Sequence, residues 1–421
     1  MSISNYSSEF EKILNRDYFS KDLHPYRKDA FSQLTKEGFP NKKWEEWRFT
    51  NLSKIVKGGY RISESNDAPK QDDFLDTYNL DEIDTIVIYN GHYIKDLSSA
   101  PEGIKLLNGE EYLSQNNNKF ECINNSPFDL LNTAFVDSGI NIVVEKNKNI
   151  KNPIRILFLA NGEDSIMVNP RLHLDIDDSS NLTFIEHHVG DAKSFFQNQS
   201  IFITAKDNAS VEHIRIQSNS ENTQNIFNLN INQSKDSNYN FYQYIDGGEL
   251  TRTNLSVNLN GQNAKCNINS LSISNDKQHV DNNIVVNHNN PNTFSSQFVK
   301  SILFDSSSGV FNGRTVVKED AQKIIAHQTN KNLLLSNTAK MNSNPQLEIY
   351  ADDVKCSHGS TTGEIDDDSL FYIQSRGIPK SEAVKLIVNG FANEAIKDIP
   401  NQEVFLFLQN RILELLKNMV K

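Results

Sequence analysis

Hydrophobic and polar residues alternate through the middle of the chain, from about residue 139 to residue 359. An alternation with a period of two predicts half-buried strands. The clearest runs are Leu182–Phe184, Phe227–Ile231, Leu255–Leu259, Ile284–Val286 and Leu347–Ile349. Asn, Gly, Ser and Asp separate these runs, as is typical of turns. The pattern favours an all-β sandwich, a barrel or a stacked β-solenoid, and the repeats are too irregular to give a period.

Helical spacing marks both ends of the chain. Ser8–Leu14 is amphipathic, and Pro25–Glu37 begins with a proline and stops before a glycine, as helices often do. Apolar residues also recur every three or four positions on either side of Pro400. Asp84–Tyr89 predicts a strand, and the Asn-Gly pair after it predicts a tight turn. We therefore expect a helical region at 1–83, an α/β connection at 84–138, a β core at 139–362 and a helical domain at 363–421.

The composition narrows the classes of function. The 421 residues carry a formal net charge of −12, which argues against a nucleic-acid-binding role, because a phosphate-binding surface needs a basic excess. The N-terminus lacks the basic start and apolar core of a signal peptide, and no apolar run is long enough to cross a bilayer. Three cysteines far apart in the sequence do not make a disulfide framework. We expect a protein of the reducing cytoplasm that binds neither nucleic acid nor membrane.

The segment 352–377 brings a thiol, an imidazole and several carboxylates together between a predicted strand and a predicted helix. If the strand continues, Val354, Cys356 and His358 share one face, and Lys355 and Ser357 point the other way. A sulfur donor and an imidazole suit iron, zinc or copper. Two ligands do not complete a metal site, so further donors must come from elsewhere, including from another chain. From the residues alone, a buried thiol and a hydrogen-bonded histidine are the favoured interpretation.

Other groups of polar residues favour structural roles. Asp366–Asp368 precede a predicted helix, whose positive N-terminus carboxylates stabilise. Glu186–His188 is interpreted as the end of a surface strand, where at most two of the three side chains could converge. His327 is expected to be structural. Neither Cys122 nor Cys266 has a metal-ligand partner nearby in the sequence.

The chain lacks the Gly-rich phosphate loop of nucleotide hydrolases and the Gly-x-Ser-x-Gly motif of a nucleophilic serine. Any ATP hydrolysis therefore belongs to a partner. No dinucleotide-binding fingerprint is present either.

Several short motifs, in order along most of the chain, resemble the SufB/SufD family of iron–sulfur cluster assembly proteins. They are the segment 38–52 with Trp44 and Trp47, the segments 309–313, 332–336 and 344–349, Cys356-Ser357-His358-Gly359, and the segments 370–372 and 375–377. The Cys-Ser-His-Gly form is similar to the SufD branch. The resemblance implies a mainly β fold, with a right-handed parallel β-helix core between N-terminal and C-terminal helical regions.

The resemblance also implies a site and partners. His358 matches a histidine that faces a cysteine of a SufB-like paralogue where a nascent iron–sulfur cluster forms, and Cys356 is a further candidate ligand. In SufB-type chains the cluster cysteine aligns with Ala339 here, and alanine can neither carry a persulfide nor bind iron. The chain is thus expected to be a non-catalytic scaffold subunit of the SUF complex.

The C-terminal helical domain at 363–421 is expected to anchor a SufC-like ABC ATPase. The region Pro379–Lys397 and the last helix would supply the contacts, with an apolar stripe on Ala383, Leu386, Ile387 and Phe391, although core packing would produce the same stripe. A homodimer in the absence of the paralogue stays open. The family's complexes have been associated with a reduced flavin, which we leave unassigned.

Two alternatives come from other classes. One is a parallel β-helix enzyme that acts on polysaccharides, but such enzymes are usually secreted. The other is an independent zinc protein, which tightly bound, stoichiometric zinc would reveal.

Overall fold

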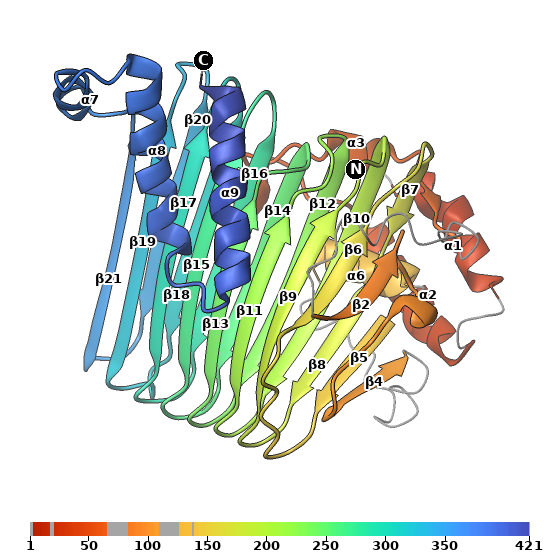
Figure 1. Cartoon of the computed structure of the whole chain (residues 1–421). Coiled ribbons are helices and arrows are strands. Elements are labelled where there is room, and N and C mark those ends of the chain that lie inside the picture. Colours follow the sequence, from red (N-terminus) through yellow and green to blue (C-terminus); the bar gives the residue numbers. More distant parts are fainter. Residues whose placement is uncertain (1–2, 17–20, 65–82, 109–125, 137–138, 421) are drawn as a thin grey trace.

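The computed structural model describes residues 3–16, 21–64, 83–108, 126–136 and 139–420. Two long sheets stack their strands turn upon turn into a parallel β-solenoid of about 8 turns (Figure 1). From β8 onward the strands alternate between the sheets along the chain, and neighbours within each sheet pair in parallel, apart from the antiparallel pairs β2–β3 and β4–β5. The expected β-helix core with helices at both ends is confirmed.

The strands of the first sheet, which we call sheet A, are β20 (Lys340–Ile349), β18 (Ser308–Val317), β16 (His279–His288), β14 (Leu250–Leu259), β12 (Thr223–Gln233), β10 (Ser194–Ala205), β8 (Arg171–Ile176), β5 (Gly139–Val144) and β4 (Ile104–Asn108), with β7 (Ser165–Val168) beside β10 and β1 (Arg61–Ile62) beside β7. The strands of sheet B are β21 (Val354–Gly363), β19 (Ile324–Leu334), β17 (Phe294–Leu303), β15 (Lys265–Ser274), β13 (Asn238–Ile245), β11 (Ser210–Gln217), β9 (Asn181–Val189), β6 (Ile154–Leu159), β2 (Asp84–Tyr89) and β3 (His92–Tyr93).

The main core lies between the two sheets. Alternate residues of each strand point inward, as the period-two pattern requires, and Leu229, Leu255 and Phe241 are among those that pack there. Residues in the left-handed region stack at one corner of the solenoid, where Ser179, Asn208 and Asp236 follow one another in successive turns. Their amides donate to the next turn, as in Asn208 N to Lys235 O at 2.8 Å. Asn and Asp tolerate this conformation better than most residues.

Asparagines also form a column on the outer face of sheet A. Asn228, Asn254, Asn283, Asn312 and Asn344 occupy the same register on five successive strands. Within the column, Asn254 Nδ2 donates to Asn228 Oδ1 at 2.9 Å. The abundance of asparagine in the sequence therefore serves both the corners and the outer face of the solenoid.

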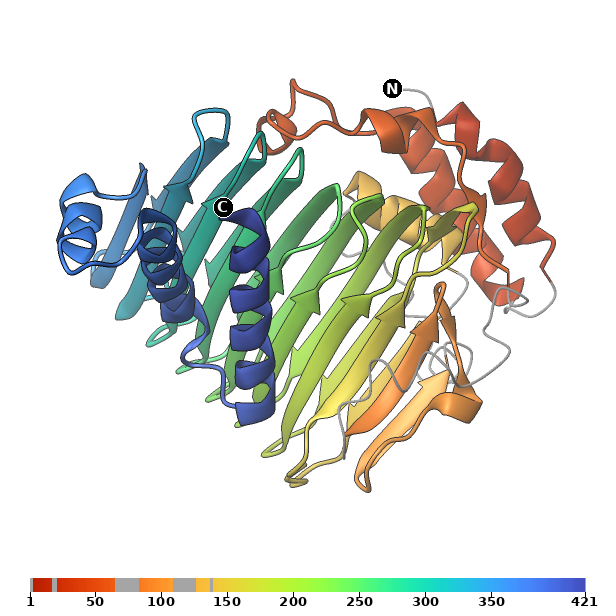
Figure 2. The same ribbon diagram turned by 45° about the horizontal axis from the view of Figure 1, so that its top comes forward.

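Helices cover one part of each sheet. At the N-terminal end, the outer face of sheet A shares a core with three helices, α1 (Ser7–Leu14), α2 (His24–Glu37) and α6 (Pro127–Phe135). A segment that contains η3 (Glu45–Trp47) and α3 (Ser53–Lys57) runs from these helices toward the last turns of the solenoid (Figure 2). At the other end, α8 (Lys380–Ile396) and α9 (Gln402–Met419) pack on the outer face of sheet B, and α7 (Asp367–Gln374) follows β21. No helix among the described residues is long and apolar enough to span a membrane.

Among the strands that the structure describes, the last turn, formed by β20 and β21, has a neighbour on one side only. Its residues are mostly exposed or half-buried, whereas the equivalent positions of earlier strands are buried. The solenoid is thus open at this end. Open strand edges pair readily with another chain.

Candidate functional site

Strand β21 carries Cys356 and His358 on its inward face at the open end. The strand pairs in parallel with β19, which places Cys356 against Ala326 and His358 against Gln328. Both β19 partners are buried, while the alternate β19 residues Ile325 and His327 are exposed. The expected facing of Cys356 and His358 is therefore observed. Two residues along a strand place their Cα atoms about 7 Å apart.

The environment of Cys356 is apolar and half-buried. It packs against a small cluster that includes Ile324, Ala326 and Val317. Burial raises the pKa of the Cys356 thiol, although a hydrogen bond from the Ala326 backbone acts in the opposite direction. The thiol therefore favours its protonated form until a metal ion or another positive charge arrives.

His358 is exposed, and hydroxyl and amide groups lie beside it on the same face. Ser343 Oγ and Ser360 Oγ both donate to Asn330 Oδ1, at 2.8 and 3.2 Å. Asn332 Nδ2 donates to Thr362 Oγ1 at 3.1 Å. These groups give the open end a polar surface next to the imidazole.

The described residues include no group of three or more His, Cys, Asp or Glu side chains that could hold a metal ion. Cys356 and His358 thus offer two donors and an open side. Any metal ion bound here needs donors from outside this set, as the sequence predicts.

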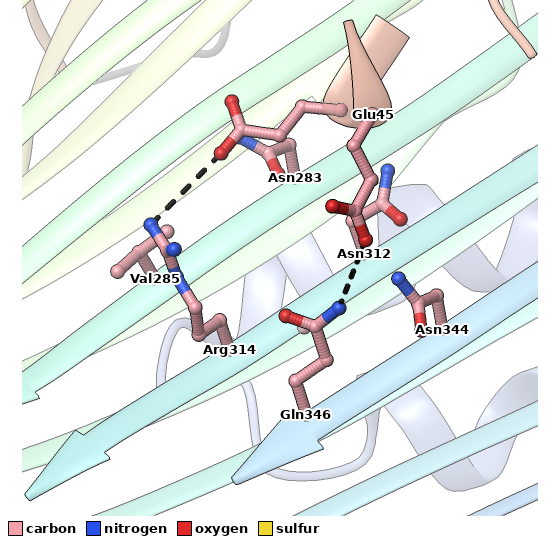
Figure 3. Close-up of a pocket in the computed structure, with 9 residues that line it drawn as sticks. Glu45, Asn283, Val285, Asn312, Arg314, Asn344 and Gln346 are labelled. Carbon is pink, nitrogen blue, oxygen red and sulfur yellow. Dashed lines mark hydrogen bonds and ion pairs between the residues drawn. The ribbon is translucent and has the colours of Figure 1, made fainter. Parts of the chain in front are cut away.

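A polar groove lies near the same end, between η3 and the outer face of sheet A (Figure 3). Asn283, Asn312 and Asn344 line it from three adjacent strands, and Arg314 lies 3.9 Å from a carboxylate oxygen of Glu46. Its volume of about 60 Å³ holds a few water molecules and no sugar chain. This groove therefore gives the polysaccharide alternative no support.

The segment Glu186–His188 is not at the surface, and that prediction is wrong. Glu186 and His188 point into the solenoid, and His187 points to the opposite face, against Phe407 of α9. Glu186 contacts His188 Nε2 at 3.0 Å and His213 Nε2 at 2.7 Å. Periodicity could not show this arrangement, because His213 comes from the next turn.

All four ring nitrogens of this pair of histidines have partners. Gln197 Nε2 lies 3.2 Å from His188 Nδ1, and the Tyr239 hydroxyl lies 2.9 Å from His213 Nδ1. Burial lowers the pKa of both histidines, against the pull of the Glu186 carboxylate. Burial alone would raise the pKa of Glu186, but the charge of Arg215 and the two histidine hydrogen bonds hold it well below its usual value. The cluster is a closed hydrogen-bonded network with no free ligand nitrogen.

The other residues named in the sequence analysis have structural surroundings or lie outside the described residues. Asp366 Oδ2 accepts a hydrogen bond from the Ser369 amide at 2.9 Å and caps α7, as expected of carboxylates before a helix. His327 is exposed and contacts Ser357 Oγ at 2.8 Å. Cys266 is buried in the solenoid, and Cys122 lies outside the described residues. Ala339 is buried before β20.

The predicted apolar stripe on α8 is partly buried against the rest of the chain and partly exposed to solvent. Ala383 is buried, and Phe391 is half-buried over the ammonium of Lys300. Ile387 is half-buried, whereas Leu386 is 53% exposed. The helix thus packs one part of the stripe on its own domain and leaves another part accessible.

Comparison with known proteins identifies the family. The family model described as SUF system FeS cluster assembly, SufBD core domain, matches residues 158–391, and the model of the SufBD protein N-terminal region matches residues 3–156. The chain belongs to the SufBD family.

Among the relatives of this SufBD chain, the Iron-sulfur cluster assembly protein SufD of Escherichia coli (strain K12) is 32% identical over 89% of each chain. An iron-sulfur cluster assembly SufBD family protein of Synechocystis is 29% identical over 89% of this chain and 87% of its own length. Protein ABCI7, chloroplastic, of Arabidopsis thaliana is 28% identical over 91% and 84%. The family's role in iron–sulfur cluster assembly is therefore the setting in which the open end is interpreted.

Proposed function

We propose that this chain is a non-catalytic, cytoplasmic scaffold subunit of a SUF assembly complex. It pairs with a SufB-like paralogue across the open end of the solenoid, and it anchors a SufC-like ATPase on its C-terminal helices. His358 is a ligand of the nascent iron–sulfur cluster, which is the cargo of the complex, and Cys356 is a second candidate ligand. The observation that carries this proposal is the exposed inward face of β21, where both side chains lie.

The unpaired edges of β20 and β21 support pairing with a second chain. In the described part of the chain, each sheet ends there with backbone donors and acceptors that pair with no further strand, and a partner that adds strands to both edges would continue the solenoid. Such a partner would lie directly over His358. It could then supply the ligands that the described residues of this chain do not provide.

The exposed apolar residues of the C-terminal helices support the second contact. Phe371 and Tyr372 are 73% and 59% exposed, and Leu386, Leu406 and Leu413 are also accessible. Exposed apolar residues gathered on a few elements often mark a protein–protein contact. A nucleotide-driven rearrangement of the bound ATPases would act on these helices and move the two scaffolds relative to one another, which opens or closes the cluster site.

Co-expression with the host's SufB-like and SufC-like proteins, followed by native mass spectrometry, tests the partners. We expect an assembly that holds this chain, one paralogue and the ATPase. His358→Ala should leave that assembly intact and lower the iron and sulfide bound after reconstitution by about tenfold or more, because a ligand is lost.

His327→Ala is the matched control, since His327 lies at the same end but on the opposite face of the neighbouring strand. It should accumulate cluster like the wild type. The proposed site fails if His358→Ala does the same. The proposed pairing fails if the chain is recovered only alone or as a self-dimer.

A further inference from the structure

A buried glutamine occupies the position on the neighbouring strand that pairs with the candidate ligand. Gln328 of β19 points into the solenoid, is 2% exposed, and is the register partner of His358 on β21. Adjacent strands of a sheet lie about 4.8 Å apart. The side chains of register partners on one face therefore stack within reach of one another.

A hydrogen bond orients the amide of Gln328. Its Nε2 donates to Gln297 Oε1 at 3.1 Å, and Gln297 Nε2 in turn donates to Thr315 Oγ1 at 3.3 Å. Gln328 therefore donates to Gln297, and Gln297 donates to Thr315. The Nε2 atom of Gln328 acts as a donor, while its Oε1 atom accepts no hydrogen bond from a described residue.

Gly313 of β18 makes room for this amide. A Cβ atom at position 313 would lie 2.3 Å from Gln328 Nε2 and 2.8 Å from its Cδ. Gly313 belongs to one of the motifs that carry the family resemblance. A larger residue at position 313 would therefore displace the Gln328 amide or the Phe311 ring, whose Cζ would lie 2.5 Å from the added Cβ.

The oxygen of Gln328 is buried and has no hydrogen-bond partner among the described residues. A buried acceptor without a donor is costly, so a structure rarely retains one without a reason. The register partner one strand away is His358, and the neutral form of an imidazole carries one N–H group and one nitrogen lone pair.

We infer that Gln328 is a positioning residue for His358. When the exposed His358 ring turns toward it, Gln328 Oε1 accepts the ring N–H, holds the ring in one tautomer and presents the other nitrogen at the open end. Histidines that bind metals usually have such a partner on the second nitrogen. That the second ring nitrogen binds the cluster rests on the proposed function. The hydrogen bond between His358 and Gln328 does not depend on it.

The tautomer of His358 tests the inference directly. Long-range ¹H–¹⁵N spectra of the full-length chain with ¹⁵N-labelled histidine report which ring nitrogen carries the proton, and His358→Ala identifies the signals. At a pH well above the ordinary histidine pKa, we expect one dominant tautomer. Gln328→Met should shift the ratio of the two tautomers by about 3- to 10-fold, the effect of one net hydrogen bond.

Two further variants separate positioning from general damage. Gln243→Met removes another buried interior glutamine, whose Nε2 donates to Ser270 and Asn282, and it should leave the His358 tautomers unchanged. Gly313→Ala keeps Gln328 but displaces its amide, and it should shift them as Gln328→Met does. An unchanged ratio in both Gln328→Met and Gly313→Ala would overturn the inference.

The tautomer ratio of His358 can be measured separately from cluster assembly, so the two proposals can fail independently. A shifted ratio with full cluster accumulation in His358→Ala would support the positioning role and defeat the proposed function. An unchanged ratio with loss of cluster in His358→Ala would defeat the positioning role alone.

Discussion

At the scale of single residues, the contacts of Arg252 explain why Trp47 and Thr50 occur in the N-terminal segment 38–52. Its guanidinium lies 3.6 Å from the centre of the Trp47 ring, pairs with the Asp281 carboxylate, and donates to the Glu46 carbonyl at 2.7 Å. The hydroxyl of Thr50 donates to the same carboxylate. Trp47 and Thr50 therefore fasten the N-terminal segment to the outer face of sheet A.

Asp281→Asn should lower the free energy of unfolding by about 3–5 kcal/mol, because it leaves the buried Arg252 charge without its partner. Urea unfolding measures the loss. Glu348→Gln is the control, since it removes one carboxylate of an exposed pair, 3.6 Å from Arg314, and should change stability by less than about 1 kcal/mol. Similar losses in the two variants would contradict the assigned role of Arg252.

At the scale of elements, two charged contacts hold the C-terminal helices on sheet B. Lys300 of β17 is fully buried, donates to the Phe391 carbonyl of α8 at 2.8 Å and pairs with Glu394. Arg411 of α9 donates to Asp246 at 2.6 Å, and the Tyr244 hydroxyl donates to the same carboxylate at 2.9 Å. The helices that we propose as the ATPase anchor are thus connected firmly to the strands that lead to the open end.

Lys300→Met should cost about 2 kcal/mol, because it removes a buried ion pair whose partner Glu394 can still turn toward solvent. Hydrogen exchange of the α8 amides should become faster. Lys331→Met removes the other, partly exposed cation beside Glu394, at 3.5 Å, and should change exchange little. Equal effects of the two variants would show that burial of Lys300 is not what secures α8.

At the scale of the whole molecule, the fold buries His187 and His288 and half-buries His173. Burial lowers the pKa of His173 and of His187 to about 3, with the charges of Arg171 and Arg155 as the respective further causes, and it lowers that of His288 to about 4. His288 donates to or accepts from Thr293 and Ser295, at 2.7 and 2.8 Å. These rings are neutral in the folded chain across the pH range in which the unfolded chain takes up protons.

The free energy of unfolding should therefore fall as the pH falls below about 6.5. The pKa values in the folded state lie below the value in the unfolded state, so the unfolded state binds more protons. Each histidine therefore lowers the free energy of unfolding by about 1.4 kcal/mol per pH unit as the pH falls toward 4. Urea unfolding between about pH 7 and pH 4.5 measures the slope. His288→Gln should reduce the slope by one such increment and Asn287→Gln should leave it unchanged; an identical slope in all three proteins would contradict this account.

The sequence by itself determined the features that depend on neighbouring residues. Strand β2 matches its predicted bounds, α2 begins one residue before its predicted start, and the facing of Cys356 and His358 follows from the geometry of one strand. These are local consequences of backbone spacing and side-chain polarity. The choice of a β-helix came from the family resemblance, since periodicity alone left three β folds open.

Only the tertiary structure decided which residues meet across turns. At the corner that follows the strands of sheet A, the left-handed residues recur at intervals of 27 to 32 residues, so no fixed period could reveal the register; they are Asn147, Ser179, Asn208, Asp236, Asn263, Asn292 and Lys323. That register brings His213 to Glu186 and pairs Gln328 with His358, and the packing of the N-terminal segment on sheet A brings Trp47 to Arg252. Each pairing depends on segments far apart in sequence, and a shift of one residue in strand pairing would turn the strand side chains to the other face.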